Sequence, residues 1–129
     1  MPLPLVPLLR NKETYPYAAT NELLYGLTTG LNCLGYEEII VGNVTAVPLT
    51  TIPVNATFAV IVAEGDVTNT DQTRVVRYRE DTVSPTPSTG MPLGDLTIYE
   101  CGGVDNMANI KFIGIEASKS QKLRVSYYG

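Results

Sequence analysis

The 129 residues of this chain are enough for one domain, since compact domains cluster at about 100 to 150 residues. Histidine is absent, which excludes imidazole acid–base catalysis, a histidine-containing triad and most catalytic zinc sites. The formal net charge of -4 has the wrong sign for a protein held mainly by nucleic-acid phosphates, and no apolar run approaches the roughly 18 residues of a membrane span, so neither partner is expected.

Residues 1–36 form an N-terminal arm that differs from the rest of the chain. Leucines and prolines dominate its start and no basic residue precedes them, which does not suit a secretion signal and predicts cytosolic synthesis. Residues 20–26 combine a cap, an acidic first turn and a terminating glycine, and they predict one or two helical turns at most. The arm is too apolar for a solvated linker, so we expect it to lie against its own domain or a neighbouring subunit.

Residues 37–129 contain short β-rich runs separated by turn residues, which predicts a single β-domain. The predicted strands are residues 38–47, 57–64, 74–80, 96–101, 109–116 and 122–128. An antiparallel sheet must bury one face, so the fold class is expected to be all-β, an antiparallel β-sandwich or jelly roll that carries an extended N-terminal arm. Helical turns are expected to be largely confined to the arm.

Alternating side chains support the strand assignments. In residues 122–128, Leu123, Val125 and Tyr127 share one face. Residues 58–63 are apolar on both faces, which predicts a central strand or a strand covered by the arm or by a partner.

Two further segments carry local predictions. Two prolines in residues 81–90 cannot donate ladder hydrogen bonds, so this segment is predicted to be a surface loop. Glu37 and Glu38 are adjacent and therefore point to opposite faces of a strand, so they do not form a catalytic carboxylate pair.

The two cysteines, Cys33 and Cys101, are far apart and form no CxxC motif. This spacing indicates two reduced, partly buried thiols, with a disulfide or mixed thiol chemistry as the alternatives.

Residues 64–71 contain four oxygen ligands within a short segment: Glu64, Asp66, Asn69 and Asp71. Their order does not fit an EF-hand, and such residues are common in turns, so we expect a solvated hairpin, with a bound cation as the alternative. The sequence contains neither a phosphate-binding glycine motif nor a GxSxG nucleophile elbow. We therefore expect no catalytic residue, no cofactor and no metal site.

Arg77 and Arg79 are the candidate binding residues of the predicted domain. Two apart on a strand, they share a face from which they can form bidentate pairs with the carboxylates of a partner. A solvated face with internal salt bridges to the local acids is the favoured interpretation, the partner interface is the alternative, and contact with nucleic acid is a third. Eight tyrosines also leave a carbohydrate-stacking surface open, although tyrosine is common in strands and interfaces.

Five segments together resemble small β-structural proteins of tailed-bacteriophage virions. They are ATFAVIVAEG at 56–65, VRYRED at 76–81, PTPSTGMPL at 85–93, IKFI at 110–113 and LRVSYY at 123–128. The family pattern is an apolar strand, a "VRYR-D" strand, a Thr/Pro loop that closes on "GMPL", and two late strands.

The resemblance covers roughly residues 48–128 and implies a virion protein made in the host cytoplasm. Small size and an apolar arm favour a capsid decoration, or cement, protein that binds the major capsid protein or other virion proteins as a dimer or trimer. A neck, tail or fibre-attachment protein and a carbohydrate-binding sandwich are the alternatives. The residues expected at the partner interface are Leu5, Leu8, Leu9, Tyr15, Tyr17, Arg77 and Arg79.

Overall fold

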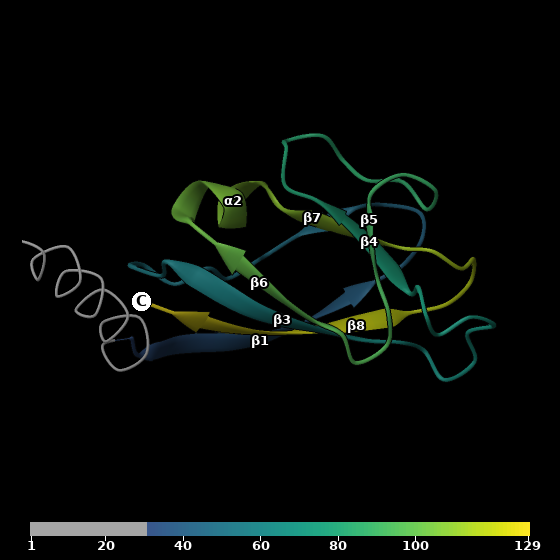
Figure 1. Cartoon of the computed structure of the whole chain (residues 1–129), viewed down its shortest axis with the longest axis horizontal. Helices are drawn as coiled ribbons and strands as arrows, with labels where there is room; N and C mark the ends of the chain where they lie inside the picture. Colours follow the sequence, from purple (N-terminus) through teal and green to yellow (C-terminus); the bar gives the residue numbers. More distant parts are fainter. Residues whose placement is uncertain (1–30) are drawn as a thin grey trace, which may run out of the picture. The chain divides into compact units, whose positions relative to one another are not determined.

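The computed structural model describes residues 31–129 (Figure 1). The short helix expected at residues 20–26 lies outside the described residues. The elements in chain order are β1 (Cys33–Val41), β2 (Val47–Pro48), β3 (Phe58–Glu64), β4 (Val76–Arg79), β5 (Met91–Leu93), β6 (Ile98–Gly102), helix α2 (Val104–Asn109), β7 (Lys111–Gly114) and β8 (Gln121–Tyr128).

The strands form two four-stranded sheets in which every pairing is antiparallel. Sheet A has the order β1-β8-β3-β6, and sheet B has the order β2-β7-β4-β5. The prediction of an all-β antiparallel sandwich is confirmed. Because β3 lies between β8 and β6, the prediction of a central strand at residues 58–63 is confirmed as well.

The strand pairing is nested, as in one long hairpin. β1 pairs with β8, β2 with β7, β3 with β6, and β4 with β5. The folded hairpin then gains two new contacts, β3 with β8 and β4 with β7, which join the pairs into sheets. This eight-stranded arrangement is that of a jelly roll.

The structure corrects several predicted boundaries in the first half of the chain. Residues 33–36, assigned above to the arm, form the start of β1, and that strand ends at Val41 where the sequence predicted Val47. Val47 instead begins β2 in the other sheet. β5 was not predicted, because a strand of three residues with a proline at its centre has almost no alternation signal.

Helix α2 corrects the expectation that helical turns are largely confined to the arm. It follows Gly103, whose φ of 100° favours glycine, and it buries Met107. No side chain caps its N-terminus, so the sequence lacks the usual start signal. Within residues 31–129, no helix is long and apolar enough to cross a membrane.

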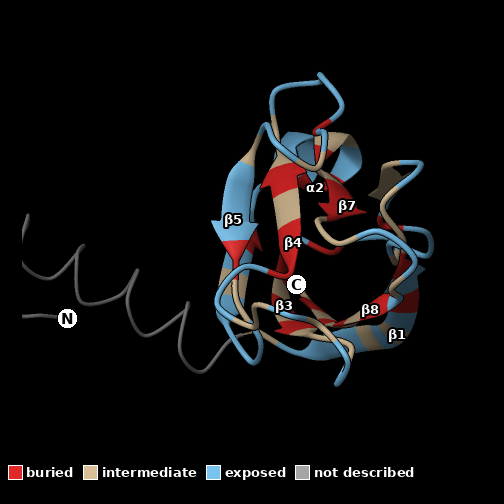
Figure 2. Ribbon diagram, turned by 90° about the vertical axis from the view of Figure 1, so that its right-hand side faces the viewer, coloured by how far each residue is buried: buried red, intermediate tan, exposed pale blue. Residues whose placement is uncertain are grey.

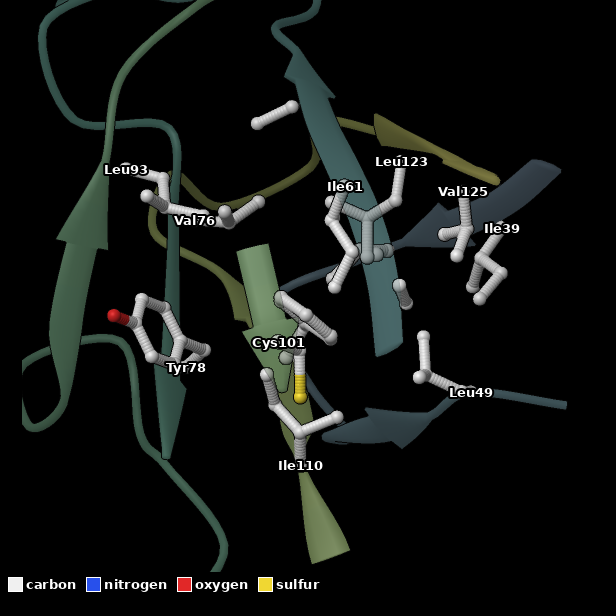
Figure 3. Close-up of a cluster of buried hydrophobic side chains, with 14 of the residues drawn as sticks. Ile39, Leu49, Ile61, Val76, Tyr78, Leu93, Cys101, Ile110, Leu123 and Val125 are labelled. Atoms are coloured by element: carbon white, nitrogen blue, oxygen red, sulfur yellow. The ribbon is translucent and has the colours of Figure 1, made fainter. Parts of the chain in front are cut away.

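The core lies between the two sheets and follows the strand period of two. Along β4, buried and half-buried residues alternate (Figure 2). Ile61 of β3 and Val125 of β8 are fully buried from sheet A, and Val76 and Phe112 are fully buried from sheet B. Figure 3 shows part of this cluster, in which aliphatic side chains from sheet A lie near Val76, Tyr78 and Leu93 of sheet B.

Replacing Ile61 by alanine tests the assignment of the core. The side chain is fully buried on the central strand, so we expect Ile61→Ala to lower the free energy of unfolding by about 2 to 5 kcal/mol. Val62→Ala on the outer side of the same strand is the matched control and should cost clearly less. Denaturant unfolding measures both, and equal losses would contradict the assignment of the two faces.

Candidate functional site

The outer face of sheet A carries apolar side chains on all four strands. Strand register places them in neighbouring rows that point away from the core. The exposed fractions are 56% for Tyr36, 58% for Ile40 and 63% for Ile98. The half-buried members of the face are Phe58, Val60, Val62 and Tyr128. These apolar groups point away from the core and are not fully covered by other described residues. A face with several such groups is a candidate interaction surface.

Charged residues of β1, β3 and β8 on the same face are paired with one another, whereas exposed Glu100 of β6 has no ion pair among the described residues. Arg124 donates from Nη1 to Glu38 Oε2 at 2.7 Å and from Nε to Glu64 Oε1 at 3.1 Å. Lys122 lies 3.5 Å from the other oxygen of Glu38. The hydroxyl of Tyr36 donates to Glu38 at 2.8 Å, and this bond, with Arg124 and Lys122, holds the pKa of Glu38 below its usual value. These exposed pairs add little stability, but they leave the face without an unpaired cluster of one sign.

Arg77 and Arg79 share the outer face of sheet B, as their spacing predicted. Arg77 donates to the carbonyl oxygens of Pro87 at 3.0 Å and Gly90 at 2.9 Å, so it fastens the largely exposed 81–90 loop to β4. Arg79 forms an ion pair with Asp81. Both guanidinium groups therefore have partners inside the chain, and their role at a partner interface stays a prediction.

The other expected interface residues belong to the arm and lie outside the described residues. They are Leu5, Leu8, Leu9, Tyr15 and Tyr17.

The carboxylates considered as cation ligands act as turn acceptors. Asp66 accepts hydrogen bonds from the backbone N–H groups of Thr68 at 2.9 Å and Ser120 at 3.2 Å. Asp71 accepts from the backbone N–H of Thr73 at 2.9 Å. The hydrogen bonds from Thr68 and Ser120 also hold the pKa of Asp66 below its usual value. The two side chains serve different turns and do not point to one shared centre.

Asn69, the third of these residues, belongs to a buried amide network. Gln121 is fully buried, and its side-chain oxygen accepts from Asn69 Nδ2 and from the backbone N–H of Asp66, both at 2.7 Å. Gln121 Nε2 donates back to Asn69 at 2.9 Å. Glu64, the fourth, faces Arg124 instead. Among residues 31–129, no three histidine, cysteine or acidic side chains gather in a way that would hold a metal ion.

Glu37 points inward and joins three segments of the chain. Its carboxylate accepts from the backbone N–H groups of Thr50 at 3.2 Å and Thr51 at 3.1 Å, and from the hydroxyl groups of Thr50 and Tyr127. Burial raises the pKa of Glu37, but the hydrogen bonds from Thr50, Tyr127 and Thr51 outweigh it and leave the pKa lowered. Glu38 points outward, so the prediction that the two glutamates do not form a pair is confirmed.

Glu80 forms a second half-buried contact, which joins sheet B to sheet A. Tyr99 donates its hydroxyl proton to Glu80 at 2.6 Å, and the thiol of Cys101 lies 3.2 Å from the same oxygen. Tyr78 of sheet B packs on Tyr99 with 4.3 Å between ring centroids. Burial, together with the carboxylate of Glu80, raises the pKa of Cys101 to about 12, so this thiol is a packing residue and a poor nucleophile.

Both cysteine thiols are free in the structure, as the sequence indicated, but the expectation that both are partly buried is wrong. Cys33 is exposed on β1, whereas Cys101 is fully buried on β6.

Two surface hollows lie at turns. One of about 640 Å³ lies between the β1–β2 turn and the β7–β8 turn, and one of about 410 Å³ lies beside Arg79, Glu80 and Asp81. In the first, Lys119 is the only charged lining residue, and in the second Arg79 is already paired with Asp81. Neither hollow combines a nucleophile with a positioned base.

A comparison with protein-family models finds no match, and neither does a comparison with curated proteins.

Sequence reasoning missed the outer face of sheet A as a whole and the role of Glu37. The face is built from four strands that are distant in sequence, so no local pattern reveals it. Glu37 had a detectable signal, because it alternates with Ile39 and Val41 and therefore shares the inward side of β1 with them.

The network around Glu37 predicts a pH dependence of stability. A carboxylate whose folded-state pKa is lowered stabilises the fold above its ordinary value of 4.5, and that stabilisation is lost as the pH falls through the folded-state pKa. We expect Glu37→Gln to be less stable than the wild type at neutral pH and the difference to shrink below pH 4.5. Glu100→Gln on exposed β6 is the control. The measurement is the free energy of unfolding of both proteins as a function of pH. A difference between Glu37→Gln and the wild type that stays constant from neutral pH to below pH 4.5 would contradict the role of Glu37.

The two thiols should differ sharply toward a thiol-specific reagent. Cys33 is exposed and should react promptly in the folded protein, whereas buried Cys101 should react only after denaturation. A Cys33→Ser variant should therefore show no prompt reaction until denaturant is added. Prompt reaction of both thiols in the native wild type would contradict the burial of Cys101.

Proposed function

We propose that this protein is a structural component of a tailed-bacteriophage virion, and specifically a capsid decoration protein that binds and stabilises the assembled head. The observation that carries the proposal is the jelly roll with an apolar outer face on sheet A. Jelly rolls occur in viral capsid domains as well as in lectins and cupins, so the fold agrees with the resemblance of residues 48–128 by analogy.

The chemistry of the described surface supports a binding role for this protein. Acidic side chains such as Glu37, Asp66 and Glu80 accept hydrogen bonds within the chain, and Arg77 and Arg79 contact their own loop. What remains available on sheet A is apolar surface flanked by paired charges. Such a surface suits a protein partner that removes it from water.

Attachment would stabilise the shell by mass action. A protein that binds the assembled lattice and not its free subunits stabilises the assembled state by RT ln(1 + [L]/Kd) per site. Many copies on a symmetric lattice add avidity, and a dimer or trimer would match the local two-fold or three-fold axes. No chemical step is required of any residue.

The arm supplies a second binding element in this proposal. Its leucines are interrupted by prolines, and this pattern predicts an extended path for the arm. Each leucine buried against a neighbour contributes about 1.5 to 3 kcal/mol before ordering costs, so several of them would decide attachment.

A protein located at the neck, the tail or a fibre would bind its partner through the same kind of surface. The number of copies per particle distinguishes these stations, because a head decoration protein repeats over the lattice whereas a neck or tail protein forms one ring.

Deleting residues 2–17 tests the proposed role of the arm. We expect the truncated protein to keep the thermal melting of the sandwich but to be lost from particles in co-sedimentation, because the leucines and Tyr15 and Tyr17 are removed. The full-length protein on the same particles is the control. Normal retention of the truncated protein would refute the role of the arm in attachment, and loss of folding would assign the arm to the core of its own domain.

A further inference from the structure

The four edges of the two sheets are protected to different degrees. β2 has two residues and β5 has three, and each contains a proline, Pro48 or Pro92. β6 has five residues and ends at Gly102. β1 has nine residues and contains no proline. Short strands, prolines and bulges prevent edge-to-edge association. β1 is the longest of the four edges and contains no proline, and beyond the register shift at Cys33–Gly35 it pairs regularly from Gly35 to Val41.

The side of β1 that faces away from β8 carries backbone N–H and C=O groups that could pair with another strand. Its residues pair with β8 on one side, from Cys33 opposite Tyr128 to Val41 opposite Gln121. In the described part of the chain, no other strand pairs with β1, and no backbone hydrogen bond from residues 33–41 reaches a loop. The N–H and C=O groups that point away from β8 therefore have no strand partner within residues 31–129, and a second strand could pair with them.

The side chains along this edge favour association over repulsion. Tyr36 and Ile40 are 56% and 58% exposed on its outer side. The charge between them, Glu38, is already held by Arg124 and Lys122. No unpaired lysine stands on the edge to keep a second strand away.

A second copy of this chain fits the edge in a specific register. In a joined sheet, the outer faces of the two copies must lie on the same side. This requires the two-fold axis to pass between a residue and the same residue of the other copy, because directly opposite residues of an antiparallel pair point to the same side. With Glu38 on the axis, Tyr36 of each copy lies opposite Ile40 of the other. The two Glu38 carboxylates then meet at the axis, but each is compensated by its own Arg124 and Lys122. With Glu37 on the axis, two carboxylates whose contacts include no cation would face each other, which is unfavourable.

We propose that β1 is the interface of a two-fold symmetric dimer, in which the β1 edges of two copies pair antiparallel with Glu38 at the axis and join the two A sheets into one. Such an interface is isologous and closed, so both β1 edges are paired within the dimer and neither can add a further copy. The inference rests on the described residues and does not require the virion role.

The mass of the full-length protein in solution tests the dimer. Sedimentation equilibrium across the micromolar range should give twice the chain mass. Ile40→Glu should weaken dimerisation at least tenfold, since it places a charge on the edge, while Lys122 opposite it on β8 keeps the monomer compatible with the change. Ile98→Glu is the matched control, because it alters an equally exposed isoleucine on the opposite edge of the same sheet and should leave the dimer intact.

Cysteine cross-linking tests the register in a Cys33→Ser background. Glu38→Cys should form a disulfide-linked dimer on mild oxidation, because residue 38 meets itself at the axis. Tyr36→Cys should not, because the two copies of residue 36 would lie about 13 Å apart, beyond the roughly 7 Å that a disulfide spans.

Four outcomes would overturn the proposal. They are a monomer throughout the micromolar range, a trimer mass, a dimer unaffected by Ile40→Glu, and cross-linking at position 36 in place of 38. The cross-linking experiment still tests the proposal if Ile40→Glu fails to fold, because its variants leave Ile40 unchanged. Failure of the particle co-sedimentation described above would not bear on this dimer.

Discussion

The pairing of β8 with β1 on one side and with β3 on the other is the contact on which the rest of the structure depends. Its inward residues Leu123, Val125 and Tyr127 are fully buried between the sheets. Its outward residue Arg124 joins β1 to β3 through their glutamates. β1 is attached to the sandwich mainly through this strand, so β8 also determines that β1 stands at the edge with its open side outward. The core, the outer face and the open edge are thus three consequences of one strand placement.

Three acceptor side chains hold distant segments around that frame. Glu37 joins β1 to β8 and to the loop after β2, and Glu80 joins the end of β4 to β6 across the two sheets. Gln121, fully buried, fastens the β3–β4 loop to the start of β8. Each satisfies groups that would be costly to bury alone, so the sandwich is closed by hydrogen bonds without a disulfide. These three polar side chains are therefore used inside the fold and are not free to bind a partner.

Sequence patterns predicted the elements in which alternation runs over several residues. β4 and β8 follow from the period of two, and so does the inward or outward placement of their side chains. β3 follows instead from a run that is apolar on both faces, which predicts a central strand but not which side chains point inward. β2 and β5 are too short for a period, and their prolines argue against strands. For the candidate site, spacing placed Arg77 and Arg79 on one face but gave no information about the carbonyl groups and the acid that bind them. Those contacts depend on how the 81–90 loop folds back over β4, which is a tertiary property.

The proposed function depends on where the protein sits on an assembled particle, and a density map of particles that carry it is the most direct measurement. We expect jelly-roll domains repeated over the outer surface of the head at symmetry-related positions, with apolar surface from sheet A or from the arm against the shell. Density confined to a single ring at the neck or tail would contradict the decoration role. Particles that contain no copy of the chain would contradict the virion role altogether.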